Sequence, residues 1–193
     1  MSDKMTLYDE LRTALHGLDA DLIENEPLKE HCTFKIGGSA EVFLCPKSEK
    51  ALIKALEVVS RRGDKLTVLG SGSNVLISDK GLSGLTVKLT GGLTDIIYLG
   101  DGVIGCSAGV PLSRLCTFAL DKELAGLEFA YGIPGSVGGA VYMNAGAYGG
   151  EMKDVLPSVR SVSKDGTGLS ETPASEMDIS YRKTPFMTNG RIV

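Results

Sequence analysis

The stretch from Tyr131 to Gly150 constrains this chain most, because it holds seven of the 25 glycines. Each glycine inside a helix or strand costs roughly 0.5–1 kcal/mol relative to alanine, so the run does not favour an ordinary helix or strand. Apolar residues interleave the glycines, which is not typical of a flexible linker. We therefore predict an ordered loop whose backbone amides face a ligand, with an anion favoured. A tight, buried crossing between two elements is the alternative.

Composition and charge exclude several classes of protein. The 193 residues, 42% of them hydrophobic, suffice for one large domain or two small ones. The net charge is −4 and no basic block occurs, so we expect no nucleic-acid partner. The four cysteines form no C-x-x-C pair and there are only two histidines, so we expect no metal site and reduced thiols, as in the cytoplasm. The N-terminus, Met1 to Met5, leads into a charged stretch without a long apolar run, so neither a signal peptide nor a membrane span is predicted.

The first half predicts a strand–helix–strand unit. Leucines at helical spacing indicate a first helix, Pro46 ends a strand, and Ser48 and Gly63 are typical helix caps. The expected elements are a helix over 6–16, a polar segment to Pro27, a strand at the end of 28–40 that enters a glycine turn, a strand over 41–45, a helix from Ser48 to Arg62 and a strand over 66–69. We expect the last three to form a right-handed βαβ unit.

The second half predicts hairpins and one helix. The expected elements are strands over 85–89, 95–99 and 103–108, a helix from Pro111 that ends before Gly126, an antiparallel hairpin over 158–172 and a strand that begins at 191–193. Gly100-Asp101-Gly102 predicts that the strands over 95–99 and 103–108 form a hairpin. A glycine break at 90–93 places a domain boundary between 1–90 and 91–193. A chain rarely stops where a strand begins, so we expect a fragment of a longer protein; a short edge strand at a natural C-terminus is the alternative.

A second glycine cluster, Gly70-Ser71-Gly72-Ser73-Asn74, directly follows the 66–69 strand. It is not a dinucleotide-binding fingerprint, because Val75 stands at the third glycine position and the following residues are β-prone. It is not a P-loop, because the Gly-Lys-Ser/Thr ending is absent. What remains is a turn whose amides and hydroxyls can form an anion nest for a pyrophosphate. With the 132–150 stretch, it predicts two glycine loops that grip one extended ligand.

A third motif, from Ile179 to Phe186, contains Arg182. The guanidinium offers a planar fork of donors suited to a carboxylate or a phosphate. A solvated surface edge is the alternative interpretation.

Together, these motifs resemble those of the UDP-N-acetylenolpyruvoylglucosamine reductase (UDP-N-acetylmuramate dehydrogenase) family, whose members are flavoenzymes. The resemblance extends over nearly the whole chain, which is similar to the N-terminal two-thirds or so of the family members. The resemblance rests on Pro27-Leu28 with 33–40, on 70–76, on 132–140 with 144–147, and on 180–186. Thr184 stands where serine is usual and keeps the hydroxyl.

The resemblance implies an α+β, FAD-binding fold of the vanillyl-alcohol-oxidase/p-cresol-methylhydroxylase type, with FAD between two α+β subdomains. By the same resemblance, Arg182 is catalytic, and Tyr181 and Arg182 bind the substrate. The implied cofactor-binding residues are Gly70, Ser71, Gly72, Ser73, Asn74, Val75, Gly135, Ser136, Val137, Gly138, Gly139, Ala140, Asn144, Gly146 and Ala147.

The activity implied is the NADPH-driven reduction of UDP-N-acetylglucosamine enolpyruvate to UDP-N-acetylmuramate, in cytoplasmic synthesis of peptidoglycan precursors. Arg182 would bind the substrate carboxylate and stabilise developing negative charge. The family's proton-donor serine and late glutamate would lie in a third domain after Val193, so we expect this chain alone to be incomplete for turnover.

Two alternatives remain. One is another flavin oxidoreductase of the same fold. Many such oxidases tether the flavin through a histidine near a glycine loop, but no histidine is near 70–74 or 132–150, so noncovalent FAD is expected. The other is a truncated FAD-binding module without turnover.

Overall fold

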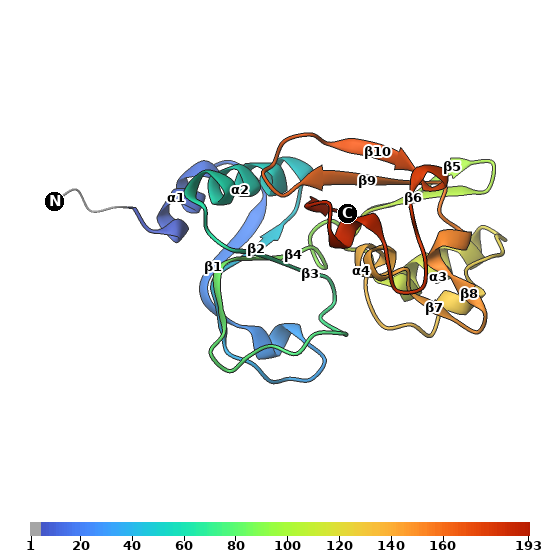
Figure 1. The fold of residues 1–193 in the computed structure, drawn as a ribbon, viewed down its shortest axis with the longest axis horizontal. Helices are drawn as coiled ribbons and strands as arrows, with labels where there is room; N and C mark the ends of the chain where they lie inside the picture. Colours follow the sequence, from blue (N-terminus) through green and yellow to red (C-terminus); the bar gives the residue numbers. More distant parts are fainter. Residues whose placement is uncertain (1–4) are drawn as a thin grey trace.

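The computed structural model describes residues 5–193, so the N-terminal residues 1–4 on which part of the signal-peptide prediction rests lie outside it. The first part of the molecule is a four-stranded sheet with two helices on one face (Figure 1). The strand order is β1 (Ala20–Pro27), β2 (Ser39–Pro46), β4 (Leu82–Lys88) and β3 (Leu66–Leu69). β1 is antiparallel to β2, whereas β2 and β3 both run parallel to β4. The expected parallel strand–helix–strand unit is present, with β4 inserted between its two strands.

The helices begin and end where their capping residues predict. In α1 (Leu7–Ala14), the Thr6 hydroxyl accepts a hydrogen bond from the backbone of Asp9. In α2 (Glu49–Arg62), Ser48 accepts one from Ala51, and Gly63 ends the helix in the left-handed conformation. The predicted first helix is therefore confirmed with slightly shorter bounds, and the second over its whole length.

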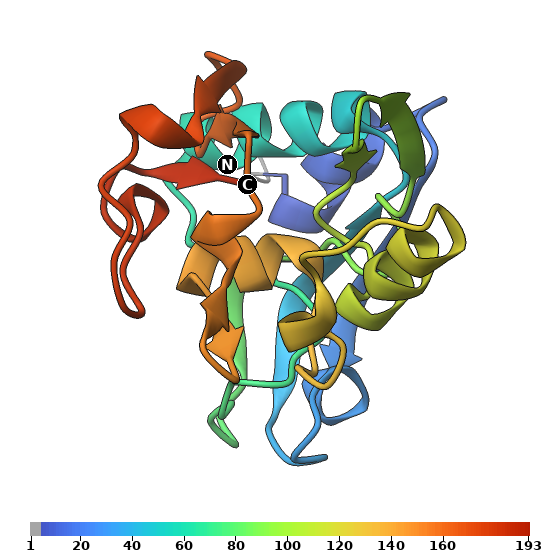
Figure 2. The same cartoon turned by 90° about the vertical axis from the view of Figure 1, so that its right-hand side faces the viewer.

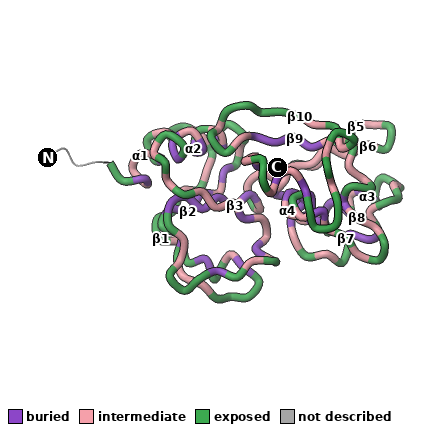
Figure 3. Tube along the Cα trace, viewed as in Figure 1, coloured by how far each residue is buried: buried purple, intermediate pink, exposed green. Residues whose placement is uncertain are grey.

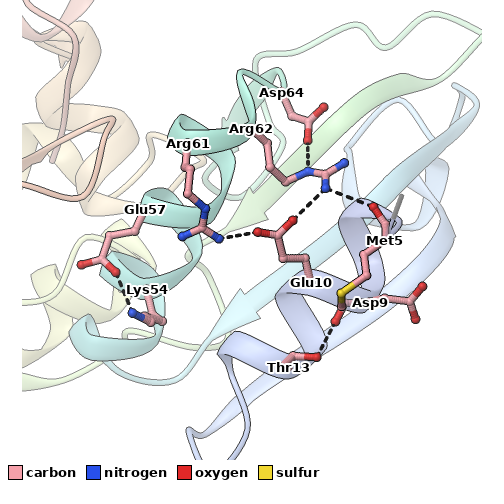
Figure 4. Close-up of polar contacts among 9 residues, drawn as sticks. All are labelled: Met5, Asp9, Glu10, Thr13, Lys54, Glu57, Arg61, Arg62 and Asp64. Atoms are coloured by element: carbon pink, nitrogen blue, oxygen red, sulfur yellow. Dashed lines mark hydrogen bonds and ion pairs between the residues drawn. The ribbon is translucent and has the colours of Figure 1, made fainter. Parts of the chain in front are cut away.

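An ion-pair network joins the two helices on the outer surface of this layer (Figure 4). Glu10 of α1 receives hydrogen bonds from Arg61 and from Arg62, the latter at 2.8 Å. Arg62 also donates to Asp64 at 2.6 Å and to the Met5 carbonyl at 3.1 Å. The hydrogen bonds from the two guanidinium groups lower the pKa of Glu10, because they stabilise its ionised form.

Two expectations for the first part are wrong. The polar segment before Pro27 forms β1, an edge strand that pairs with β2 from Ala20↔Pro46 to Pro27↔Ser39. Both of its faces are largely exposed, so its residues do not alternate between apolar and polar. Without this alternation, the sequence does not indicate a strand. The segment after it is a 3-10 helix (Leu28–His31) and an irregular loop; only Ser39 and Ala40 are extended, as the start of β2. Left-handed backbone at Lys35 and Gly37 keeps 32–38 from pairing as a strand.

The second part contains α3 (Leu112–Asp121), α4 (Val137–Met143) and short strands (Figure 2). β5 (Ile96–Gly100) and β6 (Val103–Cys106) form the expected hairpin. β9 (Ser158–Ser163) pairs with β10 (Ser170–Pro173) and with β11 (Arg191–Ile192), so the late hairpin and the late strand are also confirmed. The remaining elements are the strands β7 (Gly146–Ala147) and β8 (Gly150–Glu151) and the 3-10 turns Glu128–Ala130, Met152–Asp154, Ala174–Glu176 and Pro185–Met187.

The hydrophobic core has two large clusters, visible as the buried segments of Figure 3. One lies between α1, α2 and the four-stranded sheet; the other surrounds α3 and α4. Val162 of β9 and Ile192 of β11 belong to the first cluster, although they come from the second part of the chain. The two parts therefore share a core, and the domain boundary between 1–90 and 91–193 stays a prediction.

Neither a membrane span nor a metal centre is found within residues 5–193. None of the helices there has the length and hydropathy to cross a membrane. The same residues contain no cluster of three or more histidine, cysteine, aspartate or glutamate side chains suited to a metal. All four cysteines are free thiols, and burial raises the pKa of Cys106 to about 11.

We predict that Asp165 gives the fold a pH-dependent contribution. A hydrogen bond from Ser163, and two from the backbone and hydroxyl of Thr167 at 2.9 and 2.8 Å, lower the pKa of Asp165 from about 3.8 to about 2. The contribution is therefore complete above the unfolded pKa and is lost as the pH falls from about 4 to about 2. In urea unfolding, the free energy of unfolding of Asp165→Asn should be lower than that of wild type at pH 6, and this difference should be smaller at pH 3. A difference that is independent of pH would contradict this role.

Candidate functional site

The glycine-rich stretch contains a helix, α4, where a loop was expected. The expectation is wrong for residues 137–143 because packing outweighs propensity there. A Cβ on Gly138 would lie 2.7 Å from the Cβ of Ala108, so only glycine lets the helix approach this closely. The flanking residues 131–136 and 144–150 form turns and loops, the strand β7 and the start of β8.

The first amides of α4 are all engaged by protein acceptors. Val137 donates to the Val110 carbonyl and Gly138 to the Ala108 carbonyl, each at 2.8 Å. Gly139 donates to the Ser136 hydroxyl at 3.3 Å, which caps the helix. The start of α4 is therefore docked on residues 108–110, and its amides are not the donors expected for an anion.

The free donors lie instead in the loop after β3. Among residues 5–193, no acceptor receives the backbone N–H groups of the five consecutive residues from Ser71 to Val75, nor those of Gly135 and Ser136. Gly72 is buried and has a left-handed backbone, with φ +69°. A buried amide without a partner is costly, and successive amides around a left-handed residue form an anion-binding concavity. The loop therefore fits the pyrophosphate of an extended ligand.

The two glycine segments meet in space, as predicted. The Ser73 hydroxyl donates to the Pro134 carbonyl at 3.0 Å. A Cβ on Gly70 would lie 2.3 Å from the Ser136 hydroxyl oxygen, so the loop and the start of α4 are in direct contact. A cavity of about 550 Å³ lies between them. Its predicted lining residues are Gly70, Ser71, Gly72, Ser73, Asn74, Val75, Gly135, Ser136, Gly138, Gly139, Ala140 and Arg182.

The other predicted site residues lie outside this cavity. Val137 lines a second cavity, of about 860 Å³, near β6 and β9. Asn144 is buried, and Gly146 and Ala147 form β7. The Tyr181 side chain is 84% exposed.

The charge of the cavity is positive, although the whole chain carries −4. Its lining includes Lys164, Arg182 and Arg191 and, among the described residues, no aspartate or glutamate. Arg191 is fixed by Ser161, to whose hydroxyl and carbonyl it donates at 2.8 Å. Lys164 and Arg182 form no ion pair within residues 5–193, which leaves both for an anionic ligand.

Lys164 and Arg191 were not predicted as site residues. Lys164 begins the β9–β10 turn, where a lysine is ordinarily a solvated surface residue, and Arg191 stands in the short strand β11. They reach the cavity only because the sheet of β10, β9 and β11 packs beside it in the folded protein. A local sequence signal for either residue is lacking.

Arg182 reaches the cavity from the tip of a tight turn. Ser180 and Lys183 exchange two backbone hydrogen bonds, each of 3.0 Å, so that Tyr181 and Arg182 form a two-residue loop. Arg182 has a left-handed backbone with φ +53°. Its guanidinium carbon lies 5.9 Å from the centre of the Tyr181 ring. The turn thus places Arg182 at the rim of the cavity, with its guanidinium beside the solvent-exposed ring of Tyr181.

Comparison with known proteins identifies the class. The model of the FAD-binding domain family matches residues 40–170, and the chain belongs to this family. The confirmed resemblance is to UDP-N-acetylenolpyruvoylglucosamine reductases: identity is 45% over 169 residues with that of Syntrophomonas wolfei, covering 88% of this chain and 56% of the relative. For the Bacillus subtilis reductase the identity is 44% over 161 residues, covering 83% and 52%. The chain thus spans about half the length of the curated relatives it matches.

Solved structures support the predicted fold. The crystal structure of UDP-N-acetylenolpyruvylglucosamine reductase (MurB) from Thermus caldophilus matches with a TM-score of 0.74 at 33% identity, over 91% of this chain and 60% of that chain. A VAO-type flavoprotein from Myceliophthora thermophila matches with a TM-score of 0.62 at 13% identity, over 90% of this chain and 43% of that one. The second likeness shows the fold alone, and the predicted α+β flavin-binding fold is confirmed.

We predict that Gly72 is required twice, for its backbone and for its lack of a side chain. A Cβ there would lie 2.0 Å from the His31 carbonyl oxygen, whereas one on Gly102, which is also left-handed, would meet nothing within 4 Å. Gly102→Ala should cost about 1–2 kcal/mol of unfolding free energy from backbone strain. Gly72→Ala should cost about 2–5 kcal/mol, since overpacking adds about 1–3 kcal/mol. Chemical denaturation measures both; equal losses would exclude the close contact.

Proposed function

We propose that this chain holds FAD noncovalently and forms the cofactor-binding part of an NADPH-dependent UDP-N-acetylenolpyruvoylglucosamine reductase. One observation carries the proposal: the unpaired amides of 71–75 and 135–136 meet at a cavity whose lining contains basic residues and, among the described residues, no aspartate or glutamate. These amides would hold the pyrophosphate of the cofactor. The family match and the identities above support the same cofactor.

A noncovalent flavin fits the histidines of this chain. The cavity lining contains no histidine among the described residues. His31 hydrogen-bonds to Glu26 at 2.7 Å and to Lys88 at 3.0 Å, and its ring stacks on Phe43. Its two nitrogens are therefore engaged by the first sheet and are not available to tether a cofactor in this cavity.

In the proposed reaction, bound FAD supplies the transfer of a hydride from NADPH to the enolpyruvyl double bond of UDP-N-acetylglucosamine enolpyruvate. Arg182 binds the substrate carboxylate and stabilises the negative charge that develops beside it, because a preorganised cation lowers such a barrier. Lys164 adds to the positive potential that draws the anionic substrate. Tyr181 contacts the substrate from the exposed side of the turn. The proton donor is a serine of a further domain, as the family resemblance implies.

We predict that the purified protein binds FAD and releases it on acid precipitation. If the amides hold the pyrophosphate, FAD should bind about 100-fold more tightly than riboflavin, because charged hydrogen bonds contribute about 1.5–3 kcal/mol each. Fluorescence titration with both ligands measures the ratio. Raising the salt concentration should weaken the binding of FAD and leave that of riboflavin unchanged.

Equal affinities for FAD and riboflavin would refute the assignment of the amides, even if the protein is yellow. A protein that takes up neither ligand would refute the proposed function itself. Gly132→Ala is a control for the effect of substitution as such, because a Cβ at this position meets nothing within 4 Å and the glycine is not left-handed. Both affinities should stay unchanged in this variant.

We predict that Arg182→Ala, in the reductase that contains this chain, lowers turnover about 100- to 1000-fold, the usual loss when a group that stabilises developing charge is removed. Flavin content should stay unchanged, because the free amides are on other segments. The turnover of Arg182→Lys should lie between that of wild type and that of Arg182→Ala, since lysine keeps the charge and loses the planar fork. Steady-state kinetics and the ratio of flavin to protein absorbance are the measurements. Turnover near that of wild type in Arg182→Ala would remove the residue from the mechanism.

A further inference from the structure

The turn that carries Arg182 has only exposed interactions of its own, among them the ion pair between Lys183 and Asp178 at 3.0 Å, and exposed ion pairs contribute little. Its two backbone hydrogen bonds are exposed to solvent around Tyr181 and Arg182. The left-handed backbone of Arg182 is costly for a residue with a side chain. A guanidinium that must meet a carboxylate needs a defined position, so the turn requires support from outside.

Asn144 supplies the first support. Its side chain is buried, with the residue 3% exposed, and donates from Nδ2 to the Ser180 carbonyl at 3.0 Å and to Glu151 at 2.6 Å. Its Oδ1 accepts a hydrogen bond from the backbone of Lys153 at 3.0 Å. The reversed amide would set its oxygen against two acceptors, so the observed orientation is required. Asn144 also ends α4 in the left-handed conformation.

Thr184 supplies the second support. It is buried, with 3% exposed, and its hydroxyl donates to the Tyr142 carbonyl at 2.7 Å. Tyr142 is in the last turn of α4, where carbonyl groups lack partners within the helix. Both supports therefore join the Arg182 turn to one place, the C-terminal end of α4. Tyr142, Met143 and Ala145 from this end line the cavity together with Arg182.

We propose that Asn144 and Thr184 are positioning residues that set the place of the Arg182 guanidinium in the cavity. Asn144 acts through the Ser180 carbonyl and Thr184 through the end of α4, and neither needs to touch the ligand. Asn144 thus has a different task from the cofactor contact expected from the sequence. The catalytic meaning of this positioning rests on the proposed function, whereas the anchoring of the turn does not.

Hydrogen–deuterium exchange of the amides of Ser180 and Lys183 tests the anchoring on the chain itself. Thr184→Val removes the hydroxyl at nearly constant shape and should raise the exchange rate of these amides about tenfold, the effect of one lost buried hydrogen bond. Thr184→Ser keeps the hydroxyl and should exchange like wild type. Amides of α3 should be unchanged in both variants and show that the fold is intact.

Asn144→Gly tests the support that Asn144 provides without disturbing the backbone, because glycine readily adopts the left-handed angles of this position. It should also raise exchange at Ser180 and Lys183 about tenfold. Asp101→Gly is the matched control, since Asp101 is a left-handed residue in the distant β5–β6 turn. Unchanged exchange at 180 and 183 in both Thr184→Val and Asn144→Gly would overturn the anchoring.

A double-mutant cycle tests the link to Arg182 in the reductase that contains this chain. Thr184→Val should lower turnover at least tenfold in the presence of Arg182 and have no further effect in an Arg182→Ala background. Thr184→Ser should restore turnover, and flavin content should stay constant. Additive losses would overturn the positioning role. If the wild type binds no FAD, the proposed function fails, while the exchange experiment still decides whether the turn is anchored.

Discussion

The docking of α4 on residues 108–110 is the constraint on which the rest of the site depends. Two backbone hydrogen bonds of 2.8 Å and the Gly138–Ala108 contact fix the start of this helix. A helix start is ordinarily a ready anion site, but here its amides already have protein partners. Amides without a protein acceptor lie instead in the neighbouring loop after β3. The helix acts as a rigid spacer between that loop at one end and the Arg182 turn at the other.

The electrostatic character of the cavity is local and does not follow from the charge of the chain. Acidic residues predominate overall, yet the carboxylates described above are turned toward the helix surface, the β9–β10 turn and the side of β8. The cavity itself is lined by three basic residues, by small residues and by apolar residues, and among the described residues by no aspartate or glutamate. A net charge of −4 argues only against nucleic acid, and a phosphate-bearing ligand is fully compatible with it.

Much of the fold was predictable wherever local signals agree with the tertiary structure. Ser48 and Gly63 bound α2, and Gly100-Asp101-Gly102 marks the β5–β6 hairpin, because capping and turn chemistry act within a few residues. β1 was not predictable, since an edge strand with two exposed faces carries no periodicity. α4 was not predictable either, because the cost of its glycines is compensated by packing against Ala108, a contact between distant segments. The meeting of the two glycine segments was inferred, but Lys164 and Arg191 reach the cavity only through tertiary structure.

The packing of Val162 and Ile192 in the first core has a consequence for how the protein folds during synthesis. The β9–β10 turn also rests on α2, where a Cβ on Gly166 would lie 2.8 Å from the Ile53 carbonyl, and Arg160 pairs with Glu49 at 3.1 Å. The early sheet and its helices thus emerge from the ribosome long before the strands that cover them. The part of their apolar surface that Val162 and Ile192 cover stays open until residue 192 is available, and contacts of such long sequence separation form slowly. We therefore expect the first core to form early in synthesis and to acquire its full stability only after β11 has emerged.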